Sequence, residues 1–447
     1  MLNTASLSLD QAPPISIPFR FFLLAPLFGM VAGLLLLYWG EAALTSRWAP
    51  PTLALTHLLT LGLLGMVMCG AMLQMLPVIA GSPVPRVVLV GTLSHLLLVG
   101  GILALVAAFL IRADGLMELA ILSLGSGFLV FISGVVAALL RVHAPSATIT
   151  GMRLAIAALL LTVCFGMLVA GAWGGLLNLG SLSSLIDIHL SWGLLGWTGL
   201  LLMSVSFQVV PLFQVTPDYP GWFSRTLPRG VFLGILLWMA LRYGTDHLGW
   251  PALLEALWVA VLGLMFAAYG GMTLYLQQRR KRRITDVTLW FWRLAMLSLF
   301  AGLLAWAGGL LFPAFAASPG YPLLLGTILL LGVAVPAVNG MLYKILPFLC
   351  WFHLQNRQLA LMCMTVPVPH MKAFISDRAT KRQFHVSLLA LLLALPAALW
   401  PALLARPAGL AFALSNLLLL VNLLQAVIRY RQTSQSLDRA GAETNSH

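Results

Sequence analysis

Long apolar runs recur along almost the whole chain, and they constrain its fold more than any other feature. A helix needs about 20 apolar residues to cross the hydrocarbon core of a bilayer. Runs of this kind fill most of the 447 residues, and only 8% of the residues are charged, against roughly 25% in an ordinary soluble domain. A soluble globular enzyme, a disordered chain and a collagen-like chain are therefore excluded. The sequence predicts an all-α, polytopic membrane protein.

We predict twelve membrane spans in a single transmembrane domain over residues 1–430, followed by a polar cytoplasmic tail over 431–447. Most connections are short, and the longest predicted loop covers 351–382. The seventh span is the weakest, because Arg242 and Asp246 crowd its end. The predicted spans are 18–40, 53–79, 87–111, 115–140, 152–176, 188–213, 229–245, 250–277, 287–312, 321–350, 383–405 and 407–429.

Basic residues determine the predicted orientation. With the N-terminus inside, 19 of the 25 Lys and Arg residues fall in cytoplasmic segments, including the run 279–283, whereas the outer loops are mainly acidic. Basic residues in short loops favour the cytoplasmic side. Both termini are therefore predicted to face the cytoplasm, and the net charge of +13 needs no nucleic-acid partner. The predicted partner is the lipid bilayer.

A short pattern recurs in spans two, six and ten. In each, a proline follows a polar residue by three positions, and the prolines recur at nearly equal intervals along the chain. Each interval contains four spans with their loops. The sequence therefore predicts three four-helix units, over about 18–140, 152–277 and 287–430. The polar residues and prolines are Gln74 and Pro77, Gln208 and Pro211, and Lys344 and Pro347.

Two histidines open the second and sixth spans, and the topology places both near the outer surface. A neutral imidazole is a good ligand for heme iron, and low-spin heme takes two. His57 and His189 are therefore candidate ligands that share one heme or serve separate pockets; the alternative is a hydrogen bond from each to a carbonyl or water. His95, inside the third span, is either a functional group or a structural hydrogen-bonding residue. Asp187 either orients His189 or is a solvated loop acid.

Twelve spans in three four-helix units, with both termini inside and a histidine near the outer end of span two, resemble subunit I of the heme–copper oxidases. The end of span two, QMLPVIAGSP, is similar to that family's V-P-L-x-I-G phrase. The resemblance implies that His57 takes a heme-ligand position and His189 a metal-ligand position near copper. Span ten lacks the family's His-x-His pair, and span seven lacks its His-His pair. The resemblance thus implies a heme protein without the oxygen-reducing copper centre.

The opening PFRFFLLAPLFGMVAGLLLL is also similar to the F-R-P-F-F-L start of NnrS-type proteins, which are twelve-span relatives linked to nitric-oxide stress. Arg20 and Phe21 stand here without the intervening proline, and the His-x-His-Glu phrase of span two is reduced to His57. This resemblance implies a protein of the bacterial inner membrane, redox or nitric-oxide related, with heme as cofactor and copper as a second candidate. A role in assembly would make subunits of a respiratory complex its partners.

Two other functions stay open at this point, as does whether the chain is an enzyme. An assembly or structural subunit of a respiratory complex would keep the fold without cofactors, and the missing ligands of spans seven and ten favour it. A copper-handling transporter would use the Met and Cys clusters near 66–75 and 362–364, since thioethers and thiolates favour Cu(I). Methionine also fills gaps in apolar packing, and a threefold repeat is unusual for transporters.

Overall fold

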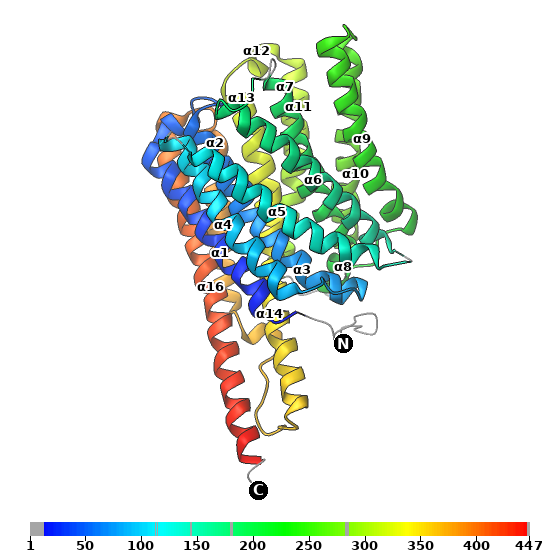
Figure 1. Ribbon diagram of the computed structural model, residues 1–447, viewed down its shortest axis with the longest axis vertical. Coiled ribbons are helices and arrows are strands. Elements are labelled where there is room, and N and C mark those ends of the chain that lie inside the picture. Colours follow the sequence, from blue (N-terminus) through cyan, green and yellow to red (C-terminus); the bar gives the residue numbers. More distant parts are fainter. Residues whose placement is uncertain are drawn as a thin grey trace.

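The computed structural model describes residues 13–111, 113, 115–143, 145–178, 182–281 and 286–444 (Figure 1). Every regular element in these ranges is a helix, which confirms the predicted all-α class. Parts of three predictions lie outside the described residues: the leading segment 1–12, positions 282–283 of the basic run, and 445–447 of the tail.

Ten helices of the described chain are long and apolar enough to cross a membrane, and each coincides with a predicted span. The chain is therefore a multi-pass membrane protein. The ten are α1 with η1 (Ser16–Leu44), α2–η2–α3 (Pro50–Ala80), α4 (Val87–Ile111), α5 (Leu116–Leu140), α6 (Ala147–Trp173), α7–η3–α8 (Leu182–Gln214), α10 (Ala252–Gln278), α11 (Val287–Leu311), α13–η4–α14 (Gly320–Ala360) and α16 (Pro401–Ala442).

Two more long helices coincide with the seventh and eleventh predicted spans. They are α9 (Gly221–His247) and α15 (Asp377–Ala397). Two arginines lie in the first three turns of α9 and four charged residues in the first two turns of α15, and neither helix meets the length and hydropathy of the other ten. The remaining elements are the short helices α12 (Pro313–Ala316) and η5 (Met371–Ala373). Length and composition therefore show ten spans in the described chain. The two predicted spans that this count leaves out are α9 and α15.

Three of the membrane helices contain a π-helical segment, which the sequence pattern did not predict. The segments are η2 (Leu58–Gly65), η3 (Trp192–Gly199) and η4 (Ile328–Ala334). Each begins the same number of positions before the recurring proline of its own span. π-Helical turns are rare and are frequent at functional sites. The recurrence therefore gives spans two, six and ten a common local geometry.

The first and last membrane helices lie side by side, with α1 along α16 (Figure 1). Glycines make this possible, because an added Cβ on Gly33 would lie 2.4 Å from the backbone nitrogen of Ala413. A Cβ on Gly409 would lie 2.6 Å from the nitrogen of Leu37. Small residues at such positions let membrane helices pack backbone against backbone. The two ends of the membrane domain are thus in direct contact.

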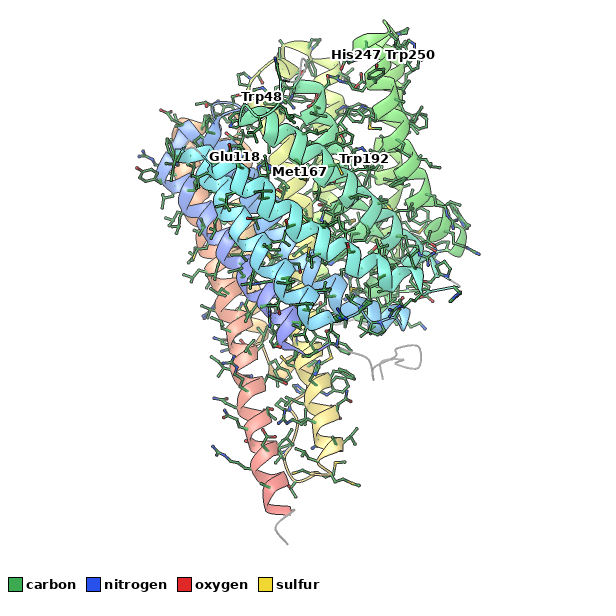
Figure 2. The ribbon with its side chains drawn as sticks, viewed as in Figure 1. Trp48, Glu118, Met167, Trp192, His247 and Trp250 are labelled. Atoms are coloured by element: carbon green, nitrogen blue, oxygen red, sulfur yellow. The ribbon has the colours of Figure 1, made fainter. Side chains whose placement is uncertain are left out.

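At one end of the molecule, α14 and α16 extend beyond the other helices as a pair (Figure 1). Helix α14 continues to Ala360 and α16 to Thr444, and an ion pair between Arg357 and Asp438 joins them. The described part of the predicted tail is therefore helical, as is the start of the predicted 351–382 loop. Trp48, His247 and Trp250 lie at the opposite end (Figure 2).

Candidate functional site

The structure brings together the two histidines that the sequence places at a common depth. His57 ends α2 and His189 lies on α7. Their ring centroids are 6.5 Å apart, and the ring planes differ by 18°. Two imidazoles from different predicted units therefore form a near-parallel pair.

A backbone carbonyl holds each ring of the pair. His57 Nδ1 lies 2.8 Å from the oxygen of Leu53, one turn earlier in the same helix, and His189 Nδ1 lies 3.0 Å from the oxygen of Thr162 on α6. A carbonyl only accepts, so both Nδ1 atoms donate, and in the neutral ring each Nε2 keeps its lone pair. Metal-binding histidines are oriented in this way, with the second nitrogen donating to a carbonyl or carboxylate.

Aromatic rings and one glycine form the immediate surroundings of the pair. The Phe109 ring of α4 lies 5.4 Å from the His57 ring, and the Trp173 ring of α6 lies 5.8 Å from that of Phe109. On α6, Gly166 faces His189: an added Cβ would lie 2.8 Å from the imidazole Cε1. The absence of a side chain at Gly166 thus provides the space that the imidazole occupies.

An ion-paired cluster holds α7 in place just beside His189. The Asp187 carboxylate lies 3.0 Å from the Arg47 guanidinium, in the segment before α2, and 3.6 Å from that of Arg242 on α9. The acceptor that orients His189 is the Thr162 carbonyl, so Asp187 acts differently from either role considered for it. It links α7 to the segment that precedes α2 and to α9.

His95 lies in another part of the molecule. Its Nε2 is 3.3 Å from the Arg20 carbonyl, and its ring meets Phe21 edge-on at 4.9 Å. On α4 it precedes Phe109, which touches His57, by about four turns, or about 21 Å along the axis. The pair and His95 therefore do not share one site, and the contacts of His95 are those of the structural hydrogen-bond alternative.

The donor set of the pair limits which groups it can hold. No cluster of three or more His, Cys, Asp or Glu side chains suited to a metal occurs in the described chain. Two imidazoles suit iron in heme, which takes two axial ligands, or copper. Neither of the two cavities described contains His57 or His189. The chemistry of the two side chains thus suits an ion that takes two imidazole ligands, and neither described cavity lies beside the pair to receive a porphyrin.

No protein-family model matches the sequence, and no curated protein matches it either. The likeness to oxidase subunit I and to NnrS-type proteins therefore depends on the short phrases quoted above and on the predicted arrangement of spans.

Proposed function

We propose that this is a heme-binding integral membrane protein, redox or nitric-oxide related, in which His57 and His189 would hold the heme iron. One observation carries the proposal: two near-parallel imidazoles 6.5 Å apart, each anchored through Nδ1 to a carbonyl. Because both Nδ1 atoms donate to carbonyls, both Nε2 lone pairs are free, and these two nitrogens would hold the heme iron. Bound heme would supply the redox or gas-binding chemistry.

The proposal includes a twelve-span architecture of three four-helix units. The matching positions of the prolines and of η2, η3 and η4 in their spans support it. So do three arginines in the first two turns of the helices that would open the units, namely Arg20 on α1, Arg153 on α6 and Arg293 on α11. In this arrangement the histidine pair lies between the first and second units, and both termini face the cytoplasm of a bacterial inner membrane.

Copper(I) is the second candidate for the same pair. Imidazole nitrogen suits copper, and neither histidine lines a described cavity, so a single ion requires less rearrangement than a porphyrin. A respiratory complex remains the proposed partner in either case.

Pyridine hemochrome and metal analysis of the purified full-length protein test the proposal. We expect close to one heme per chain from heme-replete cells, and its loss or a shifted spectrum in both His57→Ala and His189→Ala. His247→Ala is the matched control, because His247 is exposed at the end of α9 and its removal should leave the spectrum unchanged.

Three outcomes are distinguishable. Heme that depends on both histidines supports the proposal. Copper that depends on both, without heme, supports the second candidate and overturns the first. A colourless protein without stoichiometric metal, or heme that persists in both variants, overturns the assignment of the pair as ligands.

A further inference from the structure

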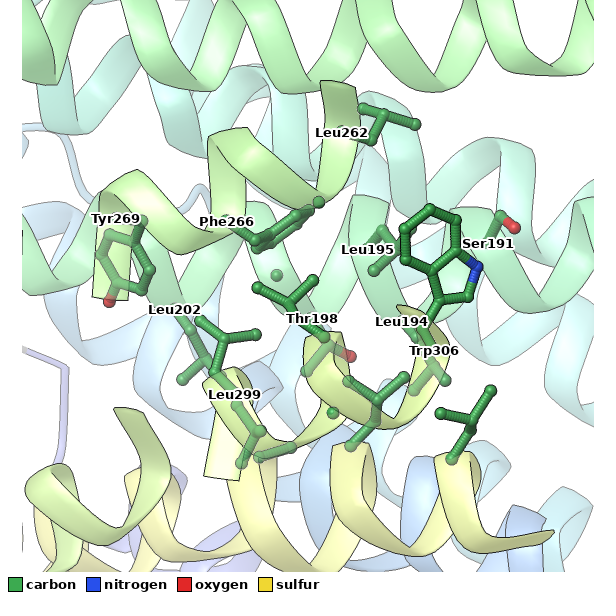
Figure 3. A pocket seen from close by; sticks show the side chains of 18 of the residues that line it. Ser191, Leu194, Leu195, Thr198, Leu202, Leu262, Phe266, Tyr269, Leu299 and Trp306 are labelled. Atoms are coloured by element: carbon green, nitrogen blue, oxygen red, sulfur yellow. The ribbon is translucent and has the colours of Figure 1, made fainter. Parts of the chain in front are cut away.

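A cavity of about 300 Å³ lies on the other side of α7 from the histidine pair, among helices of the second and third predicted units. Its walls come from α7–η3–α8, α9, α10, α11 and α13–η4–α14. Figure 3 shows it from close by, with Thr198 near the centre of the view between Phe266 and Leu299. All but one of these helical segments are long and apolar enough to cross a membrane, so a molecule dissolved in the bilayer has the most direct access.

The cavity occupies the position that corresponds, in the proposed repeat, to the histidine site. Counted back from the recurring proline of each span, Ser191 occupies in span six the position of His57 in span two. In the same way, Leu325 occupies in span ten the position of His189 in span six, and Ser191 and Leu325 both line the cavity. His189 and Ser191 are two positions apart, about 200° around the helix, so α7 carries one site on each face. The second position therefore contains neither imidazole, and no histidine lines the cavity.

The walls favour an uncharged ligand that contains a flat ring. No residue that lines the cavity carries a charged side chain, and most are aliphatic. Five aromatic residues contribute to the lining, and they favour stacked or edge-on contacts with a ring. The five are Trp238, Phe266, Tyr269, Trp292 and Trp306.

Three hydrogen-bond donors of the lining lack partners in the described chain. The Trp292 indole N–H is buried and unpaired, with the residue only 1% exposed. The hydroxyls of Ser191 and Thr198 make no hydrogen bond there, although Thr60 and Thr162 donate to carbonyls four residues earlier in their helices. Of the three, only the Trp292 indole nitrogen is a fully buried atom without a partner, and Ser191 is partly exposed. An unpaired buried donor costs free energy, and a ligand oxygen that accepts its hydrogen bond would remove this cost.

We propose that this cavity binds the head ring of a membrane-dissolved quinone. A quinone is uncharged and flat, and it carries carbonyl oxygens that accept from the three free donors. A lipid acyl chain would fill the space but would leave the donors unpaired. This inference concerns binding alone and does not depend on whether the histidine pair holds heme.

Photoaffinity labelling of the purified full-length protein tests the site directly. The probe is a benzoquinone that bears an azido group and one isoprene unit, and the unmodified quinone serves as competitor. We expect competable labelling in peptides that contain the lining of η3, α10, α11 or η4, and saturable binding by equilibrium dialysis.

Two sets of variants separate the quinone from simple space filling. Ser191→Ala and Thr198→Val each remove one donor, and each should weaken binding about fivefold. Thr226→Val is their control, because Thr226 lies outside the cavity and its hydroxyl already donates to the Trp222 carbonyl. Leu195→Trp fills the cavity and should abolish competable labelling. Leu61→Trp makes the same change at the corresponding position of span two, outside the cavity, and should preserve it.

The proposal is overturned if competable labelling maps elsewhere in the wild-type protein, an outcome that needs no variant to fold. It is also overturned if mass spectrometry finds tightly bound phospholipid that the quinone does not displace, or if the donor variants bind as the wild type does. Circular dichroism and thermal unfolding of each variant show whether lost binding reflects lost folding.

Discussion

At the scale of single residues, Gly166 makes the sharpest prediction about the histidine pair. In Gly166→Ala the new Cβ would lie 2.8 Å from the His189 Cε1, so the imidazole must shift while the helix itself gains propensity. We expect bound heme or metal to fall several-fold with little change in the unfolding midpoint. Gly100→Ala is the control, because nothing lies within 4 Å of its added Cβ. Full occupancy in Gly166→Ala would show that the ring position does not matter.

The sequence supplied the histidines of the site but not the groups that orient them. A histidine in an apolar span is a candidate ligand because its imidazole can bind a metal, and the predicted topology placed His57 and His189 at one depth. Their acceptors are backbone carbonyls of Leu53 and Thr162, which every residue possesses. Gly166 is one of 40 glycines. Such partners follow from packing between distant helices, so residue type alone does not predict them.

At the scale of elements, the position of α7 relative to α2 depends on Asp187. Asp187→Asn removes two partly buried ion pairs and leaves Arg47 and Arg242 without the acid between them. We expect a loss of about 1 kcal/mol of stability, seen as a thermal midpoint lower by about 2 °C, and a shifted heme spectrum where heme is bound. The difference from wild type should shrink in high salt, which screens exposed charges.

Asp438→Asn is the matched control for this element. It removes one exposed ion pair, with Arg357, on the α14–α16 extension. Its effect on the thermal midpoint should be smaller, and its spectrum should equal that of the wild type. If Asp187→Asn and Asp438→Asn behave alike, the cluster does not position the histidines.

The π-helical segments are the local structure that the sequence did not predict. The apolar runs and the recurring prolines located the helices, because length and hydropathy are carried by local sequence. In a π-helical turn each backbone hydrogen bond reaches one residue further along the chain than in an α-helix. The free-energy cost of this turn is offset by contacts with other helices. At Gly62, for example, an added Cβ would lie 2.6 Å from the Phe28 side chain of α1. Such contacts are visible only once the helices are assembled.

At the scale of the whole molecule, the all-helical membrane fold was predictable, while the exact number of spans was not. Helices α9 and α15 have too few uninterrupted apolar residues to be counted by composition. In a membrane such a helix is stabilised by its neighbours, and α9 packs on α10 and α15 on α16. The helical extension past the predicted tail boundary has the same origin, since α14 and α16 support each other there.

Cysteine labelling from one side of the membrane tests the twelve-span arrangement. We place single cysteines at Leu248, Met362 and Trp400, which are exposed in the connections after α9, α14 and α15, and replace the exposed native Cys164 by serine in every variant. With twelve spans and the N-terminus inside, a membrane-impermeant maleimide added outside should label positions 248 and 400 but not 362. Lysed cells should label all three.

The same three positions also give a distinct labelling pattern if only ten helices cross the membrane. If neither α9 nor α15 crosses, every connection between these two helices changes side: position 248 becomes internal and 362 becomes external, whereas 400, after α15, stays external. Labelling at 362 from outside would therefore remove the proposed arrangement of three equal units. Span ten would then run opposite to spans two and six, whereas spans two and six, which carry His57 and His189, would keep their common direction because both precede α9.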